Sequence, residues 1–295
     1  MFPTSSSSKE TKMSGLRTVS SVNDALVEVA AFAQAMPATP AWGLDGFDVV
    51  ARLRVLLANP ELIDQRGLNA CAPAVFYRLW LERDPVAAAR FTCKLLKDGS
   101  APIGSLVVAP SWKLLGQRYA QLRTVTDAAH PGATPECTDW MLLSALRDSE
   151  NIWFDYAGEP YTAGDAVAGI TLPATLASWL SATGLYNSVE NSTNLVLSAD
   201  LNQFLMQNPE PGLDILLFVN TPAIYDMTAT IPANVPDGSW VSVPNHYVHL
   251  QSMPYVDDIQ RWVHLDVWSW ARTWAGWQGS ERFRTNYFGY IRASM

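Results

Sequence analysis

Cys71 is the residue of this chain best placed to act as a nucleophile. It follows the polar segment 64–69 and precedes residues 72–82, whose apolar side chains recur at helical spacing. The start of a helix carries unpaired backbone N–H groups and the positive end of the helix dipole. Both lower the pKa of a thiol from its usual value of about 8.5 and so favour the reactive thiolate. Pro73 falls in the first turn, where its missing N–H costs no hydrogen bond.

His246 is the candidate general base. It follows Pro244 and Asn245 at the beginning of a predicted strand over residues 247–251. Side chains alternate across a strand, so His246 and His249 are expected to point to opposite faces. A histidine at the mouth of a strand is placed to face the N-terminus of a helix that packs on the sheet. We therefore expect His246 to face Cys71.

Asp266 is the candidate third group. If residues 247–251 and 262–270 form a hairpin with its turn centred on residue 256, His246 lies opposite Asp266. A carboxylate in a strand of Val, Leu and Trp is costly to bury without a partner. An imidazole is a suitable partner, because the carboxylate fixes its tautomer and stabilises the imidazolium. The alternative is an aspartate on the solvated face of an edge strand.

Gln65 lies six residues before Cys71 and completes the set. Its side-chain amide, together with the backbone N–H of Cys71, could donate to an oxyanion that forms beside the sulfur. The alternative is a polar turn residue. Cys93 lies in an amphipathic helical segment, as a buried and inert cysteine would, and Cys137 lies in a loop with no base nearby in the sequence.

The first two-thirds of the chain has helical patterning and the last third has strand patterning. Predicted helices cover residues 22–36, 48–57, 72–82, 86–98, 111–122, 140–147, 172–183 and 201–207. Predicted strands cover residues 194–197, 214–220, 240–243, 247–251 and 262–270. Helices followed by an antiparallel sheet indicate the α+β class. Residues 1–20 are expected to be a disordered lead before a single domain over residues 21–295.

Composition excludes several classes of function. The chain has 295 residues, of which 48% are hydrophobic and 16% charged, with a net charge of −8. This balance argues against a nucleic-acid partner, which requires clustered Lys and Arg. The sequence contains no run of 18 apolar residues, so no membrane span is expected. The N-terminus lacks the apolar core of a secretory signal. Three cysteines without CxxC spacing argue against a disulfide framework or a cysteine-rich zinc site, and favour folding in a reducing cytosol.

Tryptophan is abundant near the C-terminus. Five of the 12 tryptophans lie within residues 262–277. Packing in the core and sheet accounts for such residues, because their rings bury a large area. The alternative is a wall that binds a sugar or a peptide.

A glutamine lies six residues before a cysteine that opens a helix, and a histidine follows later on a strand. This pattern resembles the papain-like cysteine peptidase superfamily. The sequence NACAPA at residues 69–74 is most similar to its bacterial branches. One branch is the bacteriocin-processing peptidase domain of peptide-exporting transporters, where a glycine usually follows the cysteine and this chain has Ala72. Residues 139–151 and 267–270 also resemble bacterial papain-like proteins, some of them type VI secretion effectors.

The resemblance implies a papain-like fold in which Cys71 is the nucleophile, His246 the general base, Asp266 the orienting acid and Gln65 the oxyanion donor. The separation of Cys71 and His246 is longer than in compact members, so residues 84–190 are expected to be a helical insertion or cap. The implied activity is hydrolysis of a peptide bond in a protein substrate, and in the effector branch the protein is an antibacterial toxin. An immunity protein that blocks the cleft is the expected partner, and no cofactor or metal is expected.

The lack of a secretory signal, taken together with this resemblance, indicates a place of action. We expect the protein in the cytoplasm of the cell that makes it, or delivered into another cell by a secretion system that needs no signal peptide.

Three other functions stay open: deamidation or acyl transfer by the same thiolate, a non-catalytic binding domain with an inert Cys71, and a metal site built from histidines 246, 249 and 264 with Asp266. Strand alternation argues against the metal site, because His246 and His249 should not converge.

Overall fold

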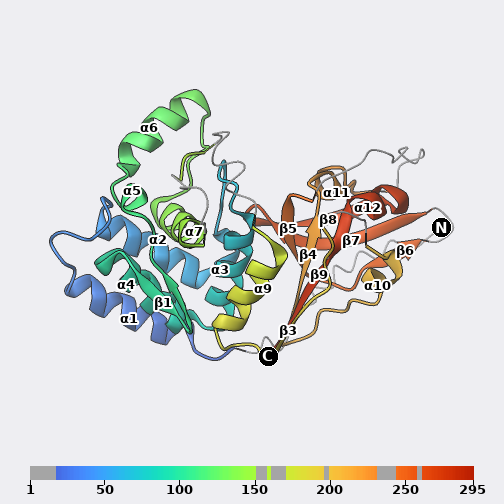
Figure 1. The fold of residues 1–295 in the computed structure, drawn as a ribbon, viewed down its shortest axis with the longest axis horizontal. Coiled ribbons are helices and arrows are strands. Elements are labelled where there is room, and N and C mark those ends of the chain that lie inside the picture. Colours follow the sequence, from blue (N-terminus) through green and yellow to red (C-terminus); the bar gives the residue numbers. More distant parts are fainter. Residues whose placement is uncertain (1–17, 151–157, 161–170, 196–198, 231–243, 258–260) are drawn as a thin grey trace, which may run out of the picture.

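The computed structural model describes residues 18–150, 158–160, 171–195, 199–230, 244–257 and 261–295. Helices from the first part of the chain form one layer, and a curled antiparallel sheet, built mainly from the last third, forms the other (Figure 1). The α+β class predicted from the sequence is confirmed. Most of the predicted disordered lead and the predicted strand over residues 240–243 lie outside the described residues.

The helical layer follows the predicted pattern closely. Its long helices are α1 (Val22–Gln34), α2 (Gly46–Ala58), α3 (Cys71–Arg83), α4 (Pro85–Asp98), α6 (Tyr119–Ala129), α7 (Cys137–Ser149) and α9 (Pro173–Ala182). The Asp45 side chain caps the N-terminus of α2, and Gly99 ends α4 with a φ of 76°, a conformation that suits glycine. The predicted helix over 111–122 is divided instead into a short α5 (Trp112–Leu115) and α6, separated at Gly116.

The sheet has the strand order β3-β9-β4-β5-β7-β6, and β8 pairs with β7. Its strands are β3 (Ser188–Asn191), β4 (Leu213–Val219), β5 (His246–Leu250), β6 (Tyr255–Asp257), β7 (Trp262–Ser269), β8 (Arg272–Gly279) and β9 (Tyr287–Ser294). All pairings are antiparallel. Short elements complete the described fold: the hairpin of β1 (Ala101–Ile103) and β2 (Leu106–Val108), the 3-10 turn Pro60–Leu62, α10 (Leu201–Leu205), α11 (Pro222–Tyr225) and α12 (Ser280–Asn286).

The register between β5 and β7 differs from the prediction. The strands pair His249 with Trp268, and the backbone N–H of Gln251 donates to the carbonyl of Asp266 over 2.8 Å. Asp266 therefore lies opposite Gln251 and not opposite His246, a displacement of five residues. The reason is β6, which occupies the segment expected to be a simple turn and pairs with β7 itself.

Both faces of the central strands are buried. Every residue of β4 and of β5 is buried. One hydrophobic core joins Leu216, Phe218 and Tyr247 to the helical layer, and a second core packs Val219 and Val248 on the opposite face. Helix α3 lies between the other helices and β5, so its N-terminus meets the sheet at the start of β5 (Figure 1). No helix among the described residues is long and apolar enough to cross a bilayer.

Candidate active site

A pocket of about 420 Å³ lies in front of the N-terminus of α3. We call it the Cys71 pocket. It is lined by Gln65, Arg66, Gly67, Leu68, Asn69, Cys71, Thr171, Phe218, Thr221, Tyr225, Asn245, His246, Tyr247 and Trp270. Three of the four residues predicted from the sequence, Gln65, Cys71 and His246, therefore share one pocket. The fourth, Asp266, does not line it.

Cys71 is the first residue of α3 and keeps partial contact with solvent. Its thiol donates to the backbone carbonyl of Asn245, with an Sγ–O distance of 3.8 Å. Burial raises the pKa of the thiol to about 11, although backbone N–H groups of Tyr247, Ala72 and Cys71 itself act in the opposite direction. The helix N-terminus therefore does not outweigh desolvation, and the thiol is protonated at neutral pH.

His246 is buried at the beginning of β5, and its ring is held on two sides. Its Nε2 lies 2.6 Å from the hydroxyl oxygen of Ser269. Its ring stacks on the indole of Trp270 with centroids 4.1 Å apart and planes 8° apart. Burial lowers the pKa of the imidazole to about 3, so the ring is neutral at neutral pH. Within the described part of the chain, no hydrogen bond joins His246 to the thiol of Cys71.

The alternation predicted for β5 is present, but its orientation relative to the helices is reversed. His246 shares a face with Val248 and Leu250, which belong to the core on the far side of the sheet from α3. His249 shares the other face with Tyr247 and contacts Arg78 of α3. His246 nevertheless reaches the Cys71 pocket, because it is the first residue of the strand and stands at the rim of the sheet.

Asp266 has other partners than the one predicted. Its Oδ2 accepts a hydrogen bond from the hydroxyl of Ser252 over 2.7 Å, and its Oδ1 lies 3.7 Å from Nδ1 of His264. The predicted contact between Asp266 and His246 is wrong, because β6 shifts the register of the hairpin. Ser269 occupies the place beside the His246 imidazole, and no pattern in the sequence had indicated it.

Gln65 is buried and its amide has a fixed orientation. Its Oε1 accepts a hydrogen bond from the backbone N–H of Ala70 over 2.9 Å. Since the amide is planar, the NH₂ end is the one left to donate. That end has no hydrogen-bond partner among the described residues. The Cys71 pocket is therefore bordered by a side-chain donor at the offset from the cysteine that the sequence indicated.

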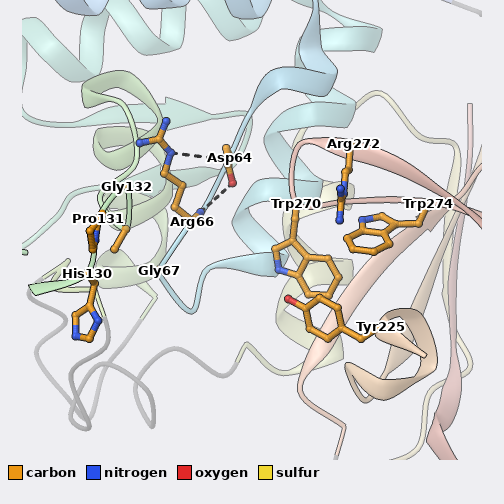
Figure 2. Close-up of a pocket in the computed structure, with 11 residues that line it drawn as sticks. Asp64, Arg66, Gly67, His130, Pro131, Gly132, Tyr225, Trp270, Arg272 and Trp274 are labelled. Atoms are coloured by element: carbon orange, nitrogen blue, oxygen red, sulfur yellow. Dashed lines mark hydrogen bonds and ion pairs between the residues drawn. The ribbon is translucent and has the colours of Figure 1, made fainter. Parts of the chain in front are cut away.

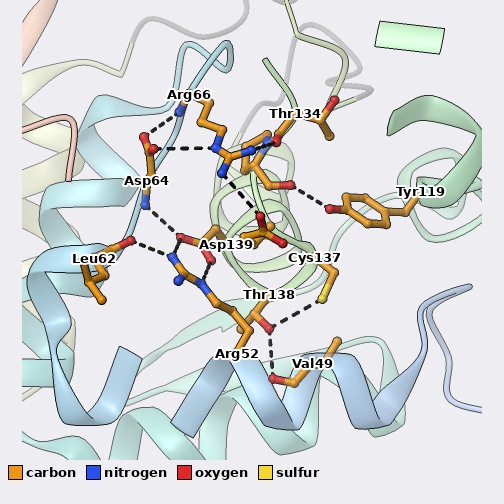
Figure 3. Close-up of polar contacts among 12 residues, drawn as sticks. Val49, Arg52, Leu62, Asp64, Arg66, Tyr119, Thr134, Cys137, Thr138 and Asp139 are labelled. Carbon is orange, nitrogen blue, oxygen red and sulfur yellow. Dashed lines mark hydrogen bonds and ion pairs between the residues drawn. The ribbon is translucent and has the colours of Figure 1, made fainter. Parts of the chain in front are cut away.

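Buried polar contacts fasten the loop that carries Gln65 to the helical layer (Figure 3). The carboxylate of Asp139, fully buried in α7, accepts hydrogen bonds from Arg52 Nε over 2.7 Å and from the backbone N–H of Asp64 over 2.8 Å. Arg66, with a φ of 43°, donates from Nη1 to the carbonyl of Thr134 over 2.8 Å. The loop is thus held on both sides of Gln65, which keeps the amide at the pocket.

A second histidine–carboxylate pair lies deeper in the structure. Asp214 of β4 accepts hydrogen bonds from Arg83 over 2.6 Å and from the hydroxyl of Tyr186 over 2.8 Å, and its Oδ1 lies 3.3 Å from His249 Nε2. Arg78 contacts the other ring nitrogen of His249. Arg78 follows Cys71 by seven residues along α3, a rise of about 10 Å. The pair therefore joins α3 to the sheet and does not belong to the Cys71 pocket.

The metal site that the sequence left open is not assembled. His246 and His249 occupy opposite faces of β5. Among the residues that the structure describes, no three His, Cys, Asp or Glu side chains converge on a point where they could hold an ion.

The turn between β7 and β8 places Trp270 over the candidate base. Trp270 and Ala271 have φ values of 47° and 58°, the left-handed conformation of a type I′ hairpin turn. Asparagine and glycine favour such turns, and a tryptophan there is unusual. The sequence Trp-Ala therefore gave no turn signal, and the contact of Trp270 with His246 could not be anticipated.

No family model matches this chain, and neither a curated protein sequence nor a solved structure does.

Proposed function

We propose that this protein is a papain-like cysteine hydrolase that cleaves a peptide bond in a protein substrate. The observation that carries the proposal is the Cys71 pocket, which joins a cysteine at a helix N-terminus, an imidazole and an oriented amide donor. Cys71 is the nucleophile, His246 the general base, and Gln65 with the backbone N–H of Cys71 the oxyanion donors. Ser269, in place of the predicted Asp266, is the positioning residue for the imidazole.

The reaction follows from these roles. As Sγ of Cys71 attacks the scissile carbonyl carbon, its proton passes to Nδ1 of His246, since Nε2 is held at Ser269. The carbonyl oxygen takes the negative charge and accepts hydrogen bonds from Gln65 Nε2 and the Cys71 N–H. His246 then protonates the leaving amine as the C–N bond breaks. Water attacks the resulting thioester, His246 takes its proton, and the carboxylic acid product leaves as the thiol is restored.

The resting protonation states determine when the proton moves. Burial raises the pKa of Cys71 to about 11 and lowers the pKa of His246 to about 3, so a neutral thiol and a neutral imidazole share the Cys71 pocket. A preformed thiolate–imidazolium pair is therefore disfavoured. In this proposal proton transfer accompanies the attack on the substrate, when the developing oxyanion is already bound.

Replacement of Gln65 by alanine tests the oxyanion donor. The variant is expected to lower kcat by about 10²–10³-fold, the usual cost of one such donor. The measurement is the cleavage rate of a peptide that spans a cut site identified by N-terminal profiling of cells expressing the active protein. Gln121→Ala, at an exposed position of α6, is the matched control. Full activity in Gln65→Ala would remove this amide from the mechanism.

Alkylation by iodoacetamide tests the neutral resting pair. The pKa of Cys71 is about 11. At pH values below this, the thiolate fraction increases about tenfold for each unit by which the pH is raised. The rate of modification of Cys71, followed by mass spectrometry between pH 6 and pH 10, is therefore expected to rise continuously. A plateau that extends into the acidic range would instead show a thiolate stabilised by an imidazolium, and would contradict the neutral pair.

The second candidate function is a binding domain without catalysis. The observation that favours it is the raised pKa of Cys71, which an inert cysteine would share. N-terminal profiling of cells expressing either the intact protein or Cys71→Ala separates the two. Cuts that depend on Cys71 support the peptidase, whereas a mass increase of about one unit without a cut would identify a deamidase. The effector role and the cleft-blocking partner stay predictions of the resemblance.

A further inference from the structure

A second cleft, of about 540 Å³, adjoins the Cys71 pocket and has no part in the chemistry described above. Its walls are the loops at residues 64–67 and 130–133 on one side and an aromatic group from α11 and the β7–β8 hairpin on the other (Figure 2). Tyr225 and Trp270 line both cavities. A chain bound over Cys71 can therefore continue into this space, which we call the aromatic cleft.

The aromatic wall is a connected stack that begins at the candidate base. One face of Trp270 covers His246, and Tyr225 stacks on Trp270 with centroids 4.7 Å apart and planes 14° apart. Trp274 meets Trp270 edge-on at 5.6 Å. Tyr225 is largely exposed, at 60% of its surface. This wall is aromatic and partly solvent-facing, as a surface that binds a peptide side chain should be.

Arg272 supplies an available positive charge at this wall. Its guanidinium lies 3.6 Å from the centroid of the Trp274 ring, and the residue is exposed. Among the described residues, no carboxylate lies within ion-pair distance of it, although the chain has a net charge of −8. Stacking occupies the face of a guanidinium and leaves its in-plane N–H groups free to bind a carboxylate.

The other arginine of the cleft is already engaged. Arg66 contacts the carboxylates of Asp64 and Glu136 and donates to the carbonyl of Thr134. It fastens the loop before Cys71, and Figure 2 shows its side chain turned toward Asp64 and away from the aromatic group. Arg272 is therefore the cation that this cleft offers to a ligand.

The position of Arg272 is determined by an unfavourable turn. It directly follows Trp270 and Ala271, which both have positive φ values. Backbone conformations of this kind persist where surrounding contacts enforce them, and they concentrate at functional sites. Here the turn directs Trp270 onto His246 and leaves Arg272 beside the same wall.

We propose that the aromatic cleft is a substrate subsite that binds a carboxylate of the peptide through Arg272. The inference rests on the proposed function and specifies its substrate class: peptides with an acidic side chain, or a free C-terminus, close to the scissile bond. Trp270, which covers His246, lines both cavities, so the two spaces are adjacent. The carboxylate is therefore expected close to the bond that is cleaved.

Peptide binding by the full-length Cys71→Ala protein tests the subsite without requiring hydrolysis. The probes are amidated octapeptide pools with Glu at one defined position, compared with pools carrying Gln there, and tryptophan fluorescence reports binding. At one or two adjacent positions, the Glu pool is expected to bind about tenfold more tightly, the lower range for a hydrogen bond to a charged group. Adding Arg272→Gln should reduce this preference to less than about twofold, whereas Arg54→Gln, an exposed position of α2, should keep it.

A third pool separates the two sources of the carboxylate. Its peptides end at the selected position with Gln and carry a free C-terminus. If they bind as tightly as the Glu pool, the subsite recognises the end of a chain. Equal binding of Glu, Gln and free-acid pools, or a preference that survives Arg272→Gln, would overturn the subsite. A Glu preference in Cys71→Ala alongside a lack of any Cys71-dependent cut would leave the subsite standing and contradict the peptidase.

Discussion

Replacement of Cys71 by alanine is expected to reduce peptide hydrolysis by about 10⁴-fold or more, since loss of a nucleophile removes the chemical step itself. The fold should be retained. The thiol lines the Cys71 pocket, is partly exposed, and donates a long hydrogen bond to the backbone carbonyl of Asn245. Removing it therefore leaves no large cavity in the core. Thermal unfolding of the variant is expected within a few degrees of the parent protein.

Two measurements make this expectation decisive. Cleavage of the peptide spanning the profiled cut site gives the rate, and calorimetry gives the stability of the same preparation. Cys137→Ala is the control, because this buried cysteine at the start of α7 contacts Thr138 and lies outside the Cys71 pocket. Retained hydrolysis in Cys71→Ala would end the proposal. If the parent protein shows no hydrolysis and Cys71→Ala is markedly destabilised, the role of Cys71 is in packing.

Local sequence features predicted the elements on which the site is built. The apolar periodicity after Cys71 located α3, and its start at the cysteine is as expected. Alternation along residues 246–250 separated His246 from His249. Both features depend on neighbouring residues alone, which is why one sequence is enough to find them.

Long-range features could not be derived in the same way. The contact between Asp266 and His246 required the β5–β7 register, and the short strand β6 changed it by five residues. Strand β9, the last in the chain, pairs with β4 in the middle of the sheet and was not predicted. Such pairings are determined by the packing of both faces of the sheet, and local patterning carries no information about them.

The face of β5 that packs on α3 also depended on a distant residue. Asp214 lies in the doubly buried β4, where a charge requires partners. Those partners, Arg83 at the end of α3 and His249, are 131 and 35 residues away in the sequence. A buried charge at Asp214 requires a cationic partner nearby. That requirement would have placed His249 on the face of β5 toward α3 and left His246 at the rim of the sheet.

Asp214 is expected to be the polar residue whose loss most strongly destabilises the junction between α3 and the sheet. Burial by itself would raise the pKa of this carboxyl, but hydrogen bonds from His249 and Arg83 outweigh it and lower the pKa below its usual value. Asp214→Asn removes the buried negative charge that Asp214 places beside the guanidinium of Arg83. Breaking a buried pair in this way costs about 3–5 kcal/mol of unfolding free energy, measured by urea denaturation at pH 7.

A matched pair of variants distinguishes charge from packing. The double variant Arg83→Met, Asp214→Leu removes both charges together and should recover more than half of the stability lost in Asp214→Asn. Glu28→Gln, in the exposed pair with Arg90, makes the same charge change at the surface and should leave stability nearly unchanged. Equal effects of Asp214→Asn and Glu28→Gln would contradict a stabilising role for the buried network.

The pH dependence of the same variant gives an independent check. Since the pKa of Asp214 is lowered in the folded protein, its stabilising contribution is present above the unfolded pKa of about 3.9 and is lost as the pH falls below it. The stability difference between the parent protein and Asp214→Asn should therefore be constant near neutrality and decrease in acid. A difference that grows on acidification would require a raised pKa and a carboxyl that is neutral in the fold. In that case Asp214 would not be the counter-ion of Arg83.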